Sequence, residues 1–109
     1  SGGIDCGNVA NNRKIVNSVF GGNNFGSNNS QLTGNCELTK VVVSALDQTT
    51  LPSAIKKNCT FANTTDGMLA TTDTNCIDQA DPDATVTTDF FGTMRPLGAG
   101  PDIGYHEAK

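Results

Sequence analysis

The segment from Asp89 to Glu107 constrains the fold more than any other part of this chain of 109 residues. Glycines and prolines recur through it beside three acidic residues, one arginine and a few large apolar side chains. Glycine and proline break both regular helices and flat strands, so this segment forms neither. It predicts an irregular, pinned structure whose charged side chains satisfy one another.

The composition favours a small all-β domain with little core material. Hydrophobic residues make up 36% of the chain and aromatic residues 6%, with no tryptophan. Strong helix formers are scarce, whereas Thr, Val, Gly and Asn are abundant, which favours short strands joined by tight turns. A chain of this length forms one domain at most.

Charge and hydropathy exclude two classes of partner. The formal net charge is −4, and the seven lysines and arginines form no long basic tract. Nucleic-acid binding needs a basic surface that neutralises phosphates, so no nucleic-acid partner is expected. No apolar run approaches the roughly 20 residues of a membrane-spanning helix, so no membrane span is expected.

The four cysteines, Cys6, Cys36, Cys59 and Cys76, indicate an oxidising compartment. None belongs to a C-x-x-C pair, and a single histidine cannot complete a zinc site. An even number of cysteines in a small chain with little core favours disulfides over four separate buried thiols. Three pairings are open. We favour Cys6–Cys36 with Cys59–Cys76, which close two successive loops, each contributing about 3 kcal/mol.

Two β-branched segments, residues 15–20 and 41–46, have the composition of short strands bounded by turn formers, and residues 30–33 form a smaller candidate. The main two start at positions 15 and 41, a spacing typical of a solenoid whose turns take roughly 20 to 30 residues. The alternative is a β-sandwich of hairpins, marked by Asn-Gly or Asp-Gly between neighbouring strands. Asp66-Gly67 is the clean example here, and it predicts a local hairpin in either fold.

The middle of the chain, residues 47–88, is less regular. Residues 51–57 predict a single helical turn. Residues 60–62 and 68–70 predict two short strands on either side of the Asp-Gly turn. Residues 76–83 are acidic and rich in turn formers.

Several motifs together resemble a known family. The chain contains a Gly-Gly-Ile start, an NSVFGGN strand and corner, and closing D-x-x-G-x-x-R-P and D-I-G-x-x-E motifs. These resemble the C-terminal part of bacterial right-handed parallel β-helix proteins of the polymorphic outer-membrane-protein and choice-of-anchor type. The segments that carry the resemblance are residues 1–6, 15–23, 61–63, 67–69, 75–81 and 89–107.

The resemblance implies an all-β fold made of the last two or three coils of a right-handed parallel β-helix. The terminal coils and their loops would occupy residues 1–88, and a C-terminal cap would occupy residues 89–109. A β-helix buries its core by stacking coils, and about three repeats are the usual minimum. The first coil would expose an open row of backbone donors and acceptors. We therefore expect it to contact missing N-terminal coils of a parent chain, or other copies stacked end to end.

Arg95 lies in the densest cluster of charge, with Asp89, Asp102 and Glu107. Arginine offers a planar fork of donors that binds carboxylates through two hydrogen bonds. One interpretation is a carboxylate- or sugar-binding site. The other, which we favour because glycines and prolines surround the cluster, is a clamp that ties the cap to the last coil. The expected cap residues are Asp89, Gly92, Arg95, Pro96, Asp102, Gly104 and Glu107.

A second acidic group consists of Asp78, Asp81 and Asp83. Calcium binds several hard oxygen ligands, and paired carboxylates hydrolyse glycosides, so a calcium site and a catalytic pair are both candidates. The spacing matches no EF-hand loop and lacks its glycine. We favour a solvated acidic loop and expect no cofactor, with calcium at these three residues as the alternative.

No catalytic residue is expected. His106 is the only histidine, the sequence places no nucleophile beside it, and no Gly-x-Ser-x-Gly motif occurs. We expect His106 on the surface of a terminal strand. Phe90 and Phe91 are expected to plug the open end of the β-helix, with sugar stacking as the alternative.

These observations predict an extracellular or cell-surface structural or adhesive module without catalysis of its own. Its polar Asn and Thr faces would bind glycans weakly. One alternative is the terminal fragment of a polysaccharide lyase or glycosidase. Another is a self-assembling filament subunit.

Overall fold

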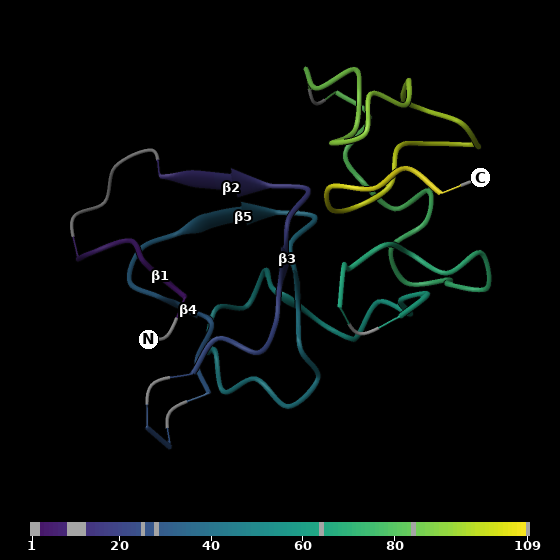
Figure 1. The fold of residues 1–109 in the computed structure, drawn as a ribbon. Coiled ribbons are helices and arrows are strands. Elements are labelled where there is room, and N and C mark those ends of the chain that lie inside the picture. The colour runs from purple at the N-terminus through teal and green to yellow at the C-terminus, as the bar shows by residue number, and fades with distance from the viewer. Residues whose placement is uncertain are drawn as a thin grey trace.

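The computed structural model describes residues 3–8, 13–24, 26–27, 29–63, 65–83 and 85–108. Within these residues the chain has no helix, so none is long and apolar enough to cross a membrane. The strands are β1 (Ile4–Asp5), β2 (Lys14–Val16), β3 (Val19–Phe20), β4 (Leu32–Thr33), β5 (Glu37–Thr39), β6 (Val42–Val43) and β7 (Ile55–Lys56) (Figure 1). The all-β prediction is confirmed.

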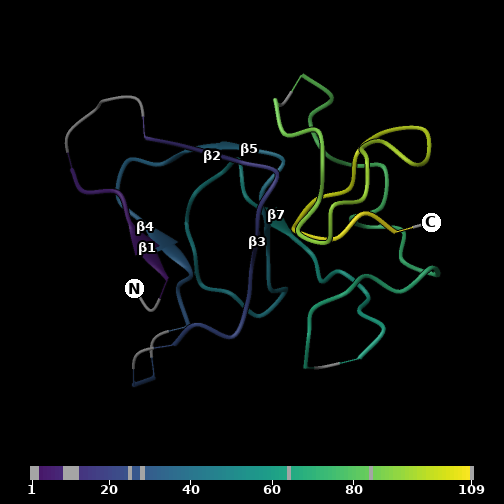
Figure 2. The ribbon, with the colours of Figure 1, turned by 45° about the horizontal axis from the view of Figure 1, so that its top comes forward.

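The strands pair in parallel, and the second set follows the path of the first. β1 pairs with β4, β2 with β5 and β3 with β6, each in parallel. β7 adds a third strand beside β6. Three small parallel sheets result, with orders β1-β4, β2-β5 and β3-β6-β7. Two consecutive passes of the chain therefore lie side by side (Figure 2).

A corner divides the strand predicted over residues 15–20, and the matching corner of the second pass lies just before the strand predicted over residues 41–46. Asn17 has φ 52° and Lys40 has φ 51°, both in the left-handed region. They are adjacent across the two passes, because Val16 pairs with Thr39 and the Asn17 N–H donates to the Thr39 carbonyl at 3.0 Å. Asparagine tolerates this conformation better than most residues, which explains why residues 15–20 split into β2 and β3.

Two local predictions have opposite outcomes. The Asp-Gly hairpin is confirmed: Phe61 forms an antiparallel bridge with Leu69, and Gly67 has φ 68°. The helical turn over residues 51–57 is wrong. That segment contains a turn followed by β7, because Ile55 pairs with Val42 and its N–H donates to the Val41 carbonyl at 2.9 Å. Pairing with an existing strand outweighs the local preference.

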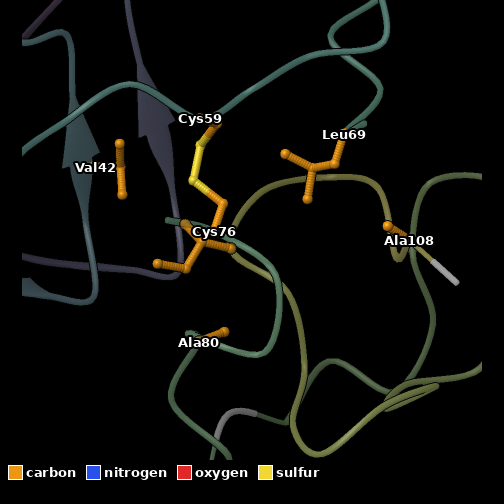
Figure 3. Packing of buried hydrophobic residues seen from close by; sticks show 7 residues of the cluster. Val42, Cys59, Leu69, Cys76, Ala80 and Ala108 are labelled. Atoms are coloured by element: carbon orange, nitrogen blue, oxygen red, sulfur yellow. A yellow bond between two sulfur atoms is a disulfide. The ribbon is translucent and has the colours of Figure 1, made fainter. Parts of the chain in front are cut away.

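The run Val41-Val42-Val43 joins two apolar clusters. Val41 and Val43 pack with Leu32 inside the strand region, against partly buried residues that include Phe20 and Leu38. Val42 points the other way, into a second cluster (Figure 3) whose buried members are Val42, Cys59, Leu69, Cys76, Ala80, Ile103 and Ala108. Alternation along a strand buried on both faces explains why the sequence reads as a continuous apolar run.

Residues 57–108, here the C-terminal region, pack on the outward face of the β3-β6-β7 sheet. Val19, Val42 and Ile55, which are register partners across its three strands, all belong to this contact. Figure 2 shows the yellow end of the chain beside β3 and β7. Residues 3–56 form the other part, here the strand region.

Each region contains one disulfide. Cys6–Cys36 joins the two passes of the strand region, and Cys59–Cys76 lies within the C-terminal region. These are the pairs that loop closure favoured, and none of the four cysteines is free. Cys59 and Cys76 belong to the apolar cluster beneath the β3-β6-β7 sheet (Figure 3).

Candidate functional site

Asp89 organises the start of the final segment by accepting three backbone hydrogen bonds. Its Oδ1 accepts from the N–H groups of Phe91 and Thr93, both at 2.8 Å, and its Oδ2 accepts from the Glu107 N–H at 2.9 Å. Gly92, with φ 82°, completes the turn that Asp89 closes. One carboxylate thus fixes a local turn and joins it to the end of the chain.

Asp102 and Glu107 are buried and bind backbone in the same way. Asp102 Oδ1 accepts from the Asp78 N–H at 2.8 Å, and Oδ2 accepts from the Ala108 N–H at 2.6 Å. Glu107 accepts from the N–H groups of Leu97 and Asp102, each at 3.0 Å. Both oxygens of each carboxylate are occupied by backbone donors.

Arg95 binds carbonyl oxygens rather than gripping a carboxylate with its fork. Nη1 donates to the Asp102 carbonyl at 3.0 Å, and Nη2 donates to the Gly104 carbonyl at 2.7 Å. Nε lies 3.6 Å from Glu107 Oε2 and makes no hydrogen bond. Pro96 follows through a cis peptide bond. The side-chain hydrogen bonds and the ion pair of Arg95 join parts of the final segment to one another, and its backbone N–H donates to the Thr87 carbonyl at 2.9 Å.

Contacts at Asn17 tie the C-terminal region to the strand region. The Asn17 Oδ1 accepts from the Asp81 N–H at 2.7 Å, and its Nδ2 donates to the Asp81 carbonyl at 3.3 Å. Its backbone carbonyl accepts from the Gly104 N–H at 2.9 Å. Gly104 has φ 104°, and a Cβ there would lie 3.3 Å from a methyl group of Val19. The corner of the first pass is thus where the final segment attaches.

The buried carboxylates differ in the direction of their pKa shifts. Burial acts to raise the pKa of Asp89, but its hydrogen bonds from Glu107, Thr93 and Phe91 outweigh burial, so the pKa lies below the ordinary value of 3.8. Burial raises the pKa of Asp102 above 3.8, with the charges of Glu107 and Asp78 adding to the rise against two backbone hydrogen bonds. Charge stabilisation therefore depends on the number and quality of the donors.

The second acidic group does not converge. Asp78 Oδ1 accepts from the Gly100 N–H at 3.0 Å, whereas Asp81 Oδ1 accepts from the Asp83 N–H at 3.0 Å. Asp83 is exposed. In the part of the chain that the structure describes, no three His, Cys, Asp or Glu residues form a group that could hold a metal ion. Asp78, Asp81 and Asp83 therefore do not form such a group.

His106 makes a specific contact with the hairpin. Its Nδ1 accepts from the Leu69 N–H at 2.9 Å. The imidazole therefore joins the end of the chain to residues 61–69, and its Nε2 is the nitrogen that carries the proton. His106 is half-buried rather than a plain surface residue.

Phe90 and Phe91 do not plug the strand region. Phe90 is 77% exposed and Phe91 is 52% exposed. They pack on Tyr105, with ring centroids 5.7 Å and 5.6 Å from it, and Phe91 also contacts the His106 ring edge-on at 5.9 Å. The expectation is wrong because the final segment lies along the side of a sheet, where these rings point into solvent.

An open groove of about 660 Å³ lies between the first pass, the hairpin and the final segment. Its aromatic lining consists of Phe20, Phe61, Tyr105 and His106, and Leu69 lies among them. The sequence alone does not bring these residues together, because they come from three segments far apart in the chain. The aromatic character of Tyr105-His106 and Phe61 was visible in the sequence, but their proximity was not.

Comparisons with known proteins add no relationship. No protein-family model, no curated protein and no solved structure matches this chain.

Proposed function

We propose that this chain is an extracellular structural or adhesive module built from the last coils of a right-handed parallel β-helix. The observation that carries the proposal is the matching register of two passes. Lys14 pairs with Glu37 and Val19 with Val42 at the same sequence offset, in separate parallel sheets. A chain that winds as stacked coils produces this pattern, because each strand meets its counterpart one turn later.

The two disulfides support an oxidising, extracellular location. Cys6–Cys36 and Cys59–Cys76 account for all four cysteines. Disulfides persist outside the reducing cytosol, and small domains with little core depend on them. The proposal of a relationship to the polymorphic outer-membrane-protein and choice-of-anchor type rests on the sequence motifs.

The buried carboxylates support a structural rather than catalytic role. Asp89, Asp102 and Glu107 each use both oxygens to accept backbone N–H groups. A general acid or base must have an oxygen available to the substrate. These three residues instead fix the path of the final segment.

The sheet edges support an end-to-end partner. Among the described strands, β1, β2 and β3 each lie at the edge of their sheet. Edge strands accept further pairing, so either more coils of a parent chain or another copy would extend the three sheets. Electron microscopy of the purified chain separates these partners: dispersed particles at high concentration contradict the filament, and fibres support it.

An engineered cross-link tests the coil architecture. Lys14 and Glu37 are exposed register partners, and neighbouring strands lie about 4.8 Å apart, within disulfide range. We expect the Lys14→Cys/Glu37→Cys variant to form a third disulfide, mapped by mass spectrometry. The control Lys14→Cys/Thr39→Cys is displaced by two positions and should stay reduced. A cross-link in the control alone would refute the stacked coils.

The enzymatic alternative needs the full parent protein. If the module is the terminator of a lyase or glycosidase, the parent depolymerises acidic polysaccharides. Turnover that disappears on the Asp81→Asn or Asp83→Asn substitution would refute the passive role. Turnover that persists would place catalysis elsewhere in the parent.

A further inference from the structure

The groove of about 660 Å³ has the size and lining of a ligand site. Small-molecule sites take roughly 300–1,000 Å³ and combine aromatic walls with a few polar groups. Here Phe61 and Tyr105 supply aromatic side chains, and Phe20, whose side chain also packs on the inner apolar cluster, completes the aromatic part of the lining. Phe61 is 40% exposed although it lies beside the apolar Leu69, so its ring is available to a ligand.

Two residues that line this groove, Tyr105 and His106, each carry a side-chain polar group without a hydrogen-bond partner among the described residues. The Nδ1 of His106 accepts the Leu69 N–H, so its Nε2–H remains a donor. The Tyr105 hydroxyl is both donor and acceptor, and it makes no hydrogen bond within the described chain. Gly67 leaves the Tyr105 ring uncovered, because a Cβ there would lie 3.4 Å from Cε1 and 3.8 Å from the hydroxyl.

The ligand class follows from these groups together. The face of an aromatic ring carries the negative part of its quadrupole, which attracts the polarised C–H groups on the face of a sugar ring. The hydroxyl groups around a sugar ring can accept a hydrogen bond from His106 Nε2–H and can donate to or accept from the Tyr105 hydroxyl. A ligand without hydrogen-bonding groups would cover the rings but would leave both polar groups unpaired, which costs free energy.

The charge of the lining selects a neutral ligand. No Asp, Glu, Lys or Arg is among the described residues that line the groove. The chain carries a formal net charge of −4. Nucleotides and acidic polysaccharides would bring phosphates or carboxylates to a groove without cations, which is unfavourable.

We propose that this groove, formed by Phe20, Phe61, Tyr105 and His106, binds a neutral oligosaccharide. The proposal deepens the adhesive part of the proposed function by naming its ligand class and its residues. It rests on the groove alone. The engineered cross-link can therefore fail to form while oligosaccharide binding is observed, and the cross-link can form while no binding is observed.

The groove contains its own optical reporter, because Tyr105 is the only tyrosine and the chain has no tryptophan. Tyrosine emission is titrated with hexasaccharides of glucose, mannose, xylose and N-acetylglucosamine, and with hexagalacturonate as an acidic probe. We expect a saturable change with at least one neutral hexasaccharide at millimolar concentration or below. No change in tyrosine emission with any of the four neutral probes, or tighter binding of hexagalacturonate than of all of them, overturns the proposal.

Two variants locate the binding. Phe61→Ala is expected to weaken it by about tenfold, equivalent to about 1.4 kcal/mol. Tyr105→Phe keeps the ring and loses the hydroxyl, and calorimetry should show a loss of a few fold. Met94→Ala, at a residue 63% exposed and outside the groove, is the matched control and should bind normally. Unchanged binding by Phe61→Ala with an unchanged melting temperature overturns the proposal.

Discussion

The strand region and the C-terminal region satisfy their backbone groups by different means. In residues 3–56 the N–H groups of one pass donate to carbonyls of the neighbouring pass, as from Val42 to Ser18 at 2.9 Å. In residues 57–108 the described pairing is limited to two isolated antiparallel bridges. Buried carboxylates accept many of the remaining N–H groups there, as Asp73 does from Thr60, Cys76 and Ile77.

The difference shows how a chain with little apolar material fixes an irregular path. A buried N–H without a partner costs free energy wherever it lies, and a strand ladder is only one way to satisfy it. A carboxylate can accept several N–H groups from residues distant in sequence, and such charge-assisted bonds are about twice as strong as neutral ones. The cost is the burial of charge, which appears in the raised pKa of Asp102.

The largest expected effect comes from removing each disulfide in turn. The sequence separation is 30 for Cys6–Cys36 and 17 for Cys59–Cys76. Because the longer loop removes more entropy from the unfolded chain, loop closure alone makes Cys6–Cys36 the more stabilising disulfide by about 0.5 kcal/mol. Packing makes Cys59–Cys76 the more stabilising disulfide, because Cys76 is 0% and Cys59 is 6% exposed within the apolar cluster. We expect Cys59→Ala/Cys76→Ala to cost about 5 kcal/mol and Cys6→Ala/Cys36→Ala about 4 kcal/mol.

Urea unfolding measures both double variants. If the Cys6–Cys36 variant is the less stable, chain entropy outweighs packing, and the C-terminal region does not depend on its core.

The buried carboxylates of the C-terminal region should contribute strongly to the free energy of unfolding, because each accepts several backbone hydrogen bonds. Asp89→Ala leaves the N–H groups of Phe91, Thr93 and Glu107 without acceptors, and we expect a loss of about 3 kcal/mol in the free energy of unfolding. The matched control is Asp83→Ala, at an exposed residue of the acidic loop, which should change it by less than about 0.5 kcal/mol. Equal effects in chemical denaturation would contradict a structural role for Asp89.

The joint between the two regions is testable at Asn17. Asn17→Ala loses both side-chain bonds to Asp81 and places a Cβ-bearing residue without a polar side chain at φ 52°. We expect a cost of about 2 kcal/mol, against about 1 kcal/mol for Asn17→Gly, which adopts this φ without strain. Hydrogen exchange at the Asp81 amide should quicken in both variants. If the two variants are equally stable, backbone strain is negligible at this corner.

The smallest expected effect is a change in how steeply the free energy of unfolding depends on pH. The pKa of Asp89 is lowered in the folded protein, so its contribution to stability is present above 3.8 and is lost as the pH falls through the folded pKa. The pKa of Asp102 is raised, so its contribution is present below 3.8 and is lost as the pH rises through the folded pKa. The two slopes oppose each other.

Denaturation midpoints between pH 7 and pH 2.5 separate the two groups. Asp89→Asn should flatten the loss of stability on acidification, whatever its absolute stability. A steeper acid loss in this variant would show that Asp89 does not gain from its three donors.

The sequence predicted those features whose cause is local. The strand predicted over residues 41–46 contains β6 at Val42–Val43, where the valine run is buried on both faces, and the Asp66-Gly67 turn follows from the φ that glycine permits. The sequence missed β1, β5 and the strand character of β7. Strands of two or three residues are too short to show a periodicity, and only the neighbouring pass makes them strands.

The candidate site was less predictable, because its chemistry depends on distant contacts. The sequence singled out Arg95 and its acidic neighbours, but the partners of the carboxylates are backbone N–H groups, which every residue carries. Whether Phe90 covers a core or faces solvent depends on which side of the sheet the final segment follows. Propensity carries no information about that choice.

The row of Val19, Val42 and Ile55 on the outward face of the β3-β6-β7 sheet has a consequence for synthesis on the ribosome. Val19, Val42 and Ile55 emerge before Ile103 and Ala108, which cover the same apolar cluster. At about 5–20 residues per second, the nascent chain carries this apolar strip uncovered for several seconds. A message truncated before the last codons would leave the strip bare permanently, and its product should be sticky and short-lived in the cell.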